Sequence, residues 1–113
     1  MLPLKNRLIR RKDFQNINTN GKKVGNEILV LKWTENNKEF LRAGFIISKK
    51  VEKKAVLRNK LKRRLREIVR SLLPEMKTGF DLIFFAKKGV TGKNYKEVRS
   101  AVLDLIKKAS LFR

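Results

Sequence analysis

The sequence predicts a single domain of 113 residues in which helices pack on a small mixed β-sheet. Two observations carry this prediction. Segments of helical periodicity alternate along the chain with short apolar runs typical of strands, and no linker, repeat or low-complexity tract separates them. The length suffices for one hydrophobic core but not for two. We therefore expect residues 1–113 to form one domain.

The first elements expected are a short helix and two strands. The helix covers residues 6–21, "NRLIRRKDFQNINTNG", and ends at Gly21. Residues 26–35 and 40–50 are rich in apolar and aromatic side chains, and the turn-forming residues "TENNKE" lie between them. This arrangement predicts an antiparallel hairpin.

Alternation of side chains sorts the residues of the two strands onto two faces. The more apolar faces, which should form the core, carry Leu29, Leu31, Trp33, Ala43, Phe45 and Ile47. For Trp33 and Phe45 we favour burial over stacking on a base. The faces that carry Val30, Lys32, Arg42, Ile46 and Ser48 should be at least partly open.

The stretch "VLRNKLKRRLREIVRSLL", residues 56–73, predicts a strongly amphipathic helix that ends before Pro74. Its apolar stripe contains Leu57, Leu61, Leu65, Ile68, Val69 and Leu72. Residues 79–89 form an apolar run between glycines, which favours a buried strand beside one of the earlier two, reached through the helix as a crossover. A last helix should follow Asn94, with Glu97 completing a capping box.

The polar side of the central helix is unusually cationic. Seven arginines and lysines share it with one carboxylate, Glu67. Four like-charged pairs at i,i+4 against one favourable pair cost the helix about 1 kcal/mol. Burial of its leucines and isoleucine, at about 1.5–3 kcal/mol each, outweighs that cost. A merely solvated face would mix in glutamates, so this face indicates a polyanionic partner.

Composition narrows the class of partner. Thirty basic against ten acidic side chains give a formal charge of +20, and there is no histidine and no cysteine. The chain therefore lacks the commonest general base and any thiolate metal site, and its scattered carboxylates predict no metal site. It has no apolar run long enough for a membrane span and no signal-peptide pattern, which fits the cytoplasm. Because the helix prefers arginine to lysine, nucleic acid is favoured over a membrane surface.

At "AVLRNKLKRRLRE" the chain resembles the bacterial ribonuclease P protein component, whose signature helix reads roughly A-x-x-R-N-x-x-K-R-x-x-R-E. The matching residues are Ala55, Arg58, Asn59, Lys62, Arg63, Arg66 and Glu67, and Lys60 stands where many members have arginine. "RLIRRKDF" (7–14) is similar to the family's R-L-x-x-x-x-D-F, and "SKK" (48–50) to its strand end. The loop "SKKVEKKAVLRN" departs from some members, because it lacks a glycine and is one residue longer.

The resemblance implies an α+β fold of the ribosomal protein S5 domain 2-like type. About four strands pack with three helices in the order α-β-β-β-α-β-α, and the β-α-β crossover is left-handed, against the general rule. The additional strand would be a short one near residues 22–26.

The resemblance also implies a function. The family's protein binds a catalytic RNA, one to one, and that RNA removes the 5′ leader of precursor tRNA with Mg²⁺ held mainly by RNA and substrate. The RNA-binding residues would be Arg58, Asn59, Lys60, Lys62, Arg63 and Arg66 on the helix and Lys49, Lys50, Lys53 and Lys54 in the loop. The single-stranded leader would lie in a cleft with Phe14 as stacking platform, Arg10 or Arg11 at its rim, and Val30, Lys32, Ile46 and Ser48 as floor. Packing of the first helix is the other interpretation of Phe14.

Two other functions remain as alternatives. A structural ribosomal protein would brace ribosomal RNA with a similar fold and no processing role. A protein nuclease acting alone would need acid–base groups, and the missing histidine argues against it. "KKGVTGK" resembles a phosphate loop only superficially, because it does not begin a P-loop pattern.

Overall fold

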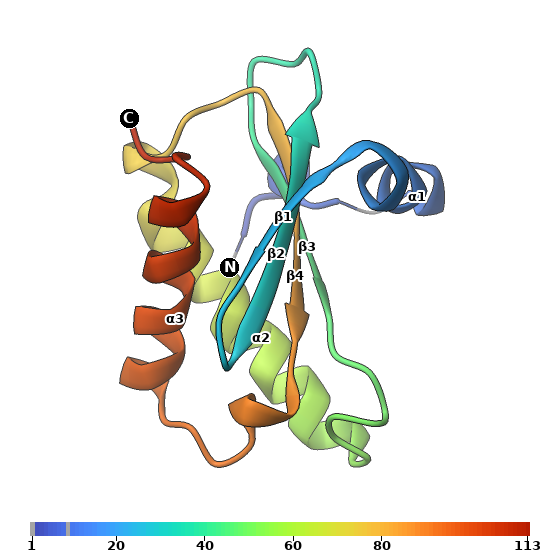
Figure 1. Cartoon of the computed structure of the whole chain (residues 1–113), viewed down its shortest axis with the longest axis vertical. Coiled ribbons are helices and arrows are strands. Elements are labelled where there is room, and N and C mark those ends of the chain that lie inside the picture. The colour runs from blue at the N-terminus through green and yellow to red at the C-terminus, as the bar shows by residue number, and fades with distance from the viewer. Residues whose placement is uncertain (1, 9) are drawn as a thin grey trace.

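The computed structural model describes residues 2–8 and 10–113, so Met1 and the part of the predicted first helix at Ile9 lie outside the described residues. The helices are α1 (Arg11–Asn20), α2 (Ala55–Leu72) and α3 (Tyr95–Lys108), and the strands are β1 (Lys22–Gly25), β2 (Leu29–Glu35), β3 (Arg42–Ile46) and β4 (Phe80–Ala86). Short 3-10 turns occupy Leu4–Asn6 (η1), Leu73–Glu75 (η2) and Lys88–Val90 (η3). Helices α2 and α3 cover one face of the sheet, and α1 lies on the other (Figure 1).

The sheet has the strand order β1-β2-β4-β3. Strand β4 pairs antiparallel with β2 and parallel with β3, and β1 forms an antiparallel pair with β2. The predicted short strand near residues 22–26 is therefore confirmed, whereas the predicted hairpin between residues 26–35 and 40–50 is wrong. The connecting loop passes over the start of β4, where Gly79 accepts a hydrogen bond from the Asn36 amide and donates one to Phe40.

The connection from β3 through α2 to β4 is the predicted crossover. In Figure 1 the two parallel strands both run downward, β4 lies nearer the viewer than β3, and α2 returns upward on the left. This path is left-handed. Helix α2 thereby lies on the same face of the sheet as α3 rather than on that of α1 (Figure 1).

Each face of the sheet has its own apolar cluster. The predicted inward residues of β2 and β3 pack with the buried side of α2 and with α3, and the rings of Phe45 and Phe84 stack with centroids 5.8 Å apart. Trp33 is half-buried against the same cluster, so both aromatics belong to the core as predicted. The smaller cluster lies under α1 and consists of Leu8, Ile17 and Ile83, with Phe14, Ile46 and Phe85 packed against it.

A partly buried ion triad also fastens α1 to the sheet. The Arg42 side chain on β3 donates two hydrogen bonds to Asp81 on β4, at 2.8 and 2.6 Å, and one to Asp13 on α1 at 3.3 Å. The side-chain amide of Asn36 donates a further hydrogen bond to Asp81 at 2.9 Å. Asp81 is 3% exposed. The hydrogen bonds to Asp81 raise the pKa of Arg42 above its ordinary value, and the negative charges of Asp81 and Asp13 also contribute.

Two helix predictions need correction. Helix α1 begins at Arg11 rather than at residue 6, because the chain before it runs along the edge of the sheet, where the Leu8 amide donates to the Ala43 carbonyl at 2.9 Å. Leu57, predicted as core, is 42% exposed, whereas Leu65 and Ile68 are fully buried. The first turn of α2 therefore lacks the apolar cover that the rest of the helix has.

Gly44 is expected to be intolerant of a side chain. A Cβ there would lie 2.7 Å from Cζ of Phe14 and 3.3 Å from Cβ of Leu8. We expect Gly44→Ala to lower the free energy of unfolding by about 1–3 kcal/mol through overpacking. Urea denaturation measures this free energy of unfolding. Phe14→Leu should offset part of the loss, and Gly25→Ala, whose Cβ meets only ordinary contacts, should change little. Additive effects of Gly44→Ala and Phe14→Leu would contradict this contact.

Candidate RNA-binding surfaces

The basic residues of α2 divide into three strips around the helix. At 100° per residue, Arg58, Lys62 and Arg66 fall on one flank of the buried stripe, and Lys60 and Arg64 fall on the opposite flank. Asn59 and Arg63 lie between the flanks on the side away from the core, and both are exposed. All six predicted signature residues therefore lie outside the core, but on surfaces that face different directions.

Arg58 has a structural partner that its motif does not reveal. Its Nη1 atom donates to the carbonyls of Glu52 and Lys53, each at 2.8 Å. The side chain therefore fixes the loop that leads into α2. Lys53 and Lys54 are exposed within this loop, with Lys54 at the N-cap position of α2.

The loop of residues 47–54 extends on the same side of the sheet as α1, at the end of the molecule away from the tip of β2 (Figure 1). Lys49 and Lys50 are exposed in it. Ser48 also belongs to the loop, because β3 ends at Ile46 and the Ser48 carbonyl accepts hydrogen bonds from the amides of Val51 and Glu52. The alternation that predicted Ser48 as part of the sheet floor does not extend to it.

The face of the sheet beneath α1 is only partly covered. Ile83 is fully buried there, but Val30, Phe85 and Ile46, which form one row across β2, β4 and β3, are half-buried. The ammonium of Lys32 lies 5.1 Å from the centroid of the Phe85 ring and donates to Asn18 on α1 at 3.1 Å. We call Val30, Lys32, Ile46 and Phe85 the sheet-face surface.

Phe85 is the member of this surface that the sequence prediction missed. It lies within a nearly continuous apolar run, which conceals the alternation that would separate buried from open positions. The pairing of β4 supplies the missing information, because Phe85 lies opposite Val30 and Ile46. An aromatic ring beside a fixed cation provides a stacking surface and a phosphate ligand together.

Phe14 lies where the sheet-face surface meets a cavity at the outer edge of β3. The cavity measures about 280 Å³, and Phe14, Gly44, Arg7 and Arg66 are among its lining residues. The Phe14 ring packs against the cluster beneath α1 and also borders this cavity. The ring therefore both anchors α1 to the sheet and presents an edge to the cavity. Arg10 and Arg11 are exposed at the start of α1. Phe14 therefore lies between the sheet face beneath α1 and the cavity that Arg66 of α2 also lines.

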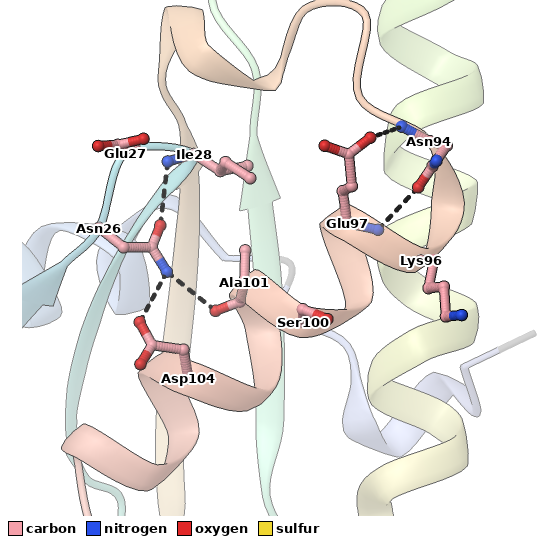
Figure 2. Close-up of a pocket in the computed structure, with 9 residues that line it drawn as sticks. All are labelled: Asn26, Glu27, Ile28, Asn94, Lys96, Glu97, Ser100, Ala101 and Asp104. Carbon is pink, nitrogen blue, oxygen red and sulfur yellow. Dashed lines mark hydrogen bonds between the residues drawn. The ribbon is translucent and has the colours of Figure 1, made fainter.

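A larger cavity, of about 590 Å³, lies between α3 and the turn from β1 to β2 (Figure 2). Its carboxylates are Glu27, Glu97 and Asp104, which makes it a poor fit for RNA. Asn26 donates to Asp104 at 3.1 Å and, with Lys108, holds the pKa of this carboxyl below its ordinary value. Glu97 and Asn94 form the predicted capping box (Figure 2). These polar groups stabilise the fold.

Two kinds of feature are absent from residues 2–8 and 10–113. No helix in this part of the chain is long and apolar enough to cross a membrane. No three side chains of the types that ligate metals gather closely enough there to hold an ion.

The fold agrees with comparisons to known proteins. A family model described as Ribonuclease P matches residues 2–110. The chain belongs to the ribonuclease P protein family. The ribonuclease P protein components of Clostridium botulinum strain 657 and of Alkaliphilus oremlandii are 39% and 40% identical to it. These matches cover 95% and 94% of this chain, and 96% and 92% of the relatives.

Solved structures of ribonuclease P proteins have the same architecture. The Staphylococcus aureus protein superimposes with a TM-score of 0.88 at 28% identity, over 96% of this chain and 98% of the other. The Thermotoga maritima protein superimposes with a TM-score of 0.83 at 34% identity, over 90% and 96% of the two chains. The predicted family and α+β fold are confirmed, and the chain is an RNA-binding subunit of ribonuclease P. None of these relatives supports the ribosomal alternative.

Proposed function

We propose that this subunit helps a catalytic RNA remove the 5′ leader of precursor tRNA, by binding both the RNA subunit and the single-stranded leader. The observation that carries the proposal is the sheet-face surface, a half-buried apolar row with an aromatic ring and a held cation. Single-stranded RNA binds such surfaces by stacking its bases on aromatic rings while its phosphates contact cations.

The leader is assigned to the side of the molecule that carries α1. The row from Val30 through Phe85 to Ile46 crosses three adjacent strands, which is about 10 Å at the usual spacing of strands. Phe14 and one of Arg10 and Arg11 extend this side beyond the sheet. The lysines of the 47–54 loop lie on the same side of the sheet, beyond the end of β3 (Figure 1), so RNA bound on this side has cations of both α1 and the loop within the same region.

The RNA subunit is assigned to the signature helix and its loop. Arg63 and Asn59 face outward, and the remaining signature residues line the flanks of α2. Arginine contacts phosphate with two parallel hydrogen bonds, and the Asn59 amide both donates and accepts, which suits sugar hydroxyls and base edges. Lys49, Lys50, Lys53 and Lys54 add charge next to the start of the helix.

The chemistry of cleavage belongs, in this proposal, to the RNA. The chain has no histidine, and its described residues do not fit a metal site of three or more ligands of its own. We assign Mg²⁺ mainly to the RNA subunit and the substrate, where it would supply charge stabilisation and an activated water. The protein's contribution is to position the leader and to lower the repulsion between two polyanions.

Reconstitution tests the proposal. Cognate RNA subunit and precursor tRNA are incubated at physiological Mg²⁺ with and without the protein, and 5′ processing is followed. We expect cleavage to require the RNA subunit and to accelerate when the protein is added. We also expect light scattering to show one protein per RNA, and fractionated cells to contain the protein in the cytoplasm. Cleavage by protein from which all RNA has been removed would refute the proposal.

A second prediction concerns the leader. Phe85→Leu keeps an apolar side chain in the row but removes the stacking surface. Because stacking contributes about 1–3 kcal/mol per base, we expect the holoenzyme to bind long-leader precursor at least roughly fivefold more weakly. Affinity for precursor with a single leader nucleotide should not change. Phe80→Leu, on the opposite face of the same strand, is the matched control. Equal losses for both substrates would place Phe85 outside the leader site.

A further inference from the structure

A second groove lies along α2, on the flank away from Arg66. It measures about 330 Å³ and separates α2 from the connection between β4 and α3. Its wall includes the apolar side chains of Leu57, Leu61 and Val90, and Lys60, Arg64 and Lys93 supply its cations. Glu52 is the one carboxylate among the lining residues. We call this cavity the α2 groove.

The α2 groove and the opposite flank of α2 cannot contact the same nucleotide. At 100° per residue, the mean direction of Lys60 and Arg64 is opposite to that of Arg58, Lys62 and Arg66. With side chains, a helix is about 10–12 Å across. The two flanks therefore present their charges to different segments of RNA.

Several features of the groove are those of a binding site. Leu57 continues the apolar stripe of α2 but is 42% exposed and lines the groove. Arg64 donates to the Lys93 carbonyl at 3.5 Å, which holds the cation beside the opposite wall. Gly92 has a φ of +77°, and a Cβ built on it meets no atom within 4 Å, so this wall is uncovered.

An apolar wall between cations fits a nucleotide whose base and phosphate both need a partner. The volume lies at the lower end of the range for small-ligand pockets, which suits one nucleotide rather than a duplex. Three cations against one carboxylate favour a phosphate group as ligand. The apolar wall adds a place for an unstacked base. RNA chains offer such bases in loops and bulges.

We propose that the α2 groove holds an unpaired nucleotide of the RNA subunit, separate from the segment of that RNA that contacts the outward side and the opposite flank of α2. This inference rests on the proposed function, because it uses the assignment of α2 to the RNA subunit. It adds Arg64, Lys93 and the apolar wall to the RNA-binding residues, and it gives the two flanks of α2 different segments of the RNA subunit.

A charge-matched pair of variants tests the role of the cations. The groove variant combines Lys60→Ala, Arg64→Ala and Lys93→Ala, and the control combines Lys22→Ala, Lys77→Ala and Lys107→Ala, three exposed lysines outside the groove. We expect the groove variant to bind the RNA subunit transcript at least roughly tenfold more weakly at 0.15 M salt, with a salt slope smaller by about 2–3. The control should lose less than roughly threefold. Equal losses would overturn the proposal.

Cross-linking identifies which RNA occupies the groove. The chain has no cysteine, so Thr91→Cys places one reactive thiol in the lining of the groove for attachment of a photoactivated aryl azide. In the assembled holoenzyme with precursor tRNA bound, we expect cross-links to nucleotides of the RNA subunit. Cross-links to precursor tRNA alone, or none above those from a Lys107→Cys control, would overturn the proposal.

The two proposals fail in different ways. If the groove variant binds and processes as the control does, while reconstituted wild-type protein still accelerates cleavage, the proposed function stands and the α2 groove is not an RNA site. If wild-type protein does not accelerate cleavage, the proposed function itself fails.

Discussion

Replacing Arg42 by alanine is expected to lower the free energy of unfolding by about 3–5 kcal/mol, because it leaves a buried carboxylate without its cation. Asp81 is 3% exposed and would retain only the hydrogen bond from Asn36. The same substitution removes the hydrogen bond to Asp13 and with it a polar link between α1 and the sheet. Urea denaturation monitored by circular dichroism measures the loss.

Arg70→Ala is the matched control for this prediction. Arg70 also faces a carboxylate, Glu67 at 3.8 Å, but both side chains are about half exposed. Exposed pairs contribute about 0–1 kcal/mol, so the control should stay within that range. If Arg42→Ala costs no more than Arg70→Ala, the triad of Arg42, Asp81 and Asp13 does not stabilise the fold.

The double variant Arg63→Ala, Arg66→Ala is expected to bind the RNA subunit roughly 10–100-fold more weakly. Two charge-assisted hydrogen-bonding groups are lost, and a tenfold change in affinity corresponds to about 1.4 kcal/mol. The slope of log affinity against log salt should become flatter by about 1–2, because fewer counterions are released. Filter binding at several salt concentrations measures both quantities.

The free energy of unfolding of this variant distinguishes an RNA-binding role of the two arginines from a structural one. Removing two cations from a strongly cationic helix relieves repulsion, so the free energy of unfolding should stay level or rise slightly. Arg63 is exposed and Arg66 borders the cavity at the β3 edge, so neither is part of the apolar core. A large loss of stability with an unchanged salt slope would show that these arginines support the fold instead.

The periodicity of the sequence predicts the elements well but not their neighbours. The capping box at Asn94, the apolar stripe of α2 from Leu65 onward and the inward faces of β2 and β3 follow from local pattern. The position of β4 between β2 and β3 does not, because the turn residues before Phe40 suit a hairpin as well as a longer loop. The pairing of β4 with both β2 and β3 distinguishes the two arrangements.

The candidate site is predictable to a similar extent. Motif positions identify the signature residues, and alternation correctly places Val30, Lys32 and Ile46 on one face. Phe85 is missed because its strand is apolar on both faces. The groove beside Lys60 depends on residues about thirty positions further along the chain, and that proximity is a property of the tertiary structure rather than of any local pattern.

The central place of β4 has a consequence for how this protein is made. Strand β3 hydrogen-bonds to β4 along its length and not to β2, and β4 is the last strand of the sheet to leave the ribosome during synthesis. A nascent chain halted before residue 80 therefore has a β1–β2 hairpin and a long basic helix but no completed sheet. Since non-local strand pairing is slow and domains fold as units, we expect such a chain to acquire its compact state only after nearly three quarters of it has been translated.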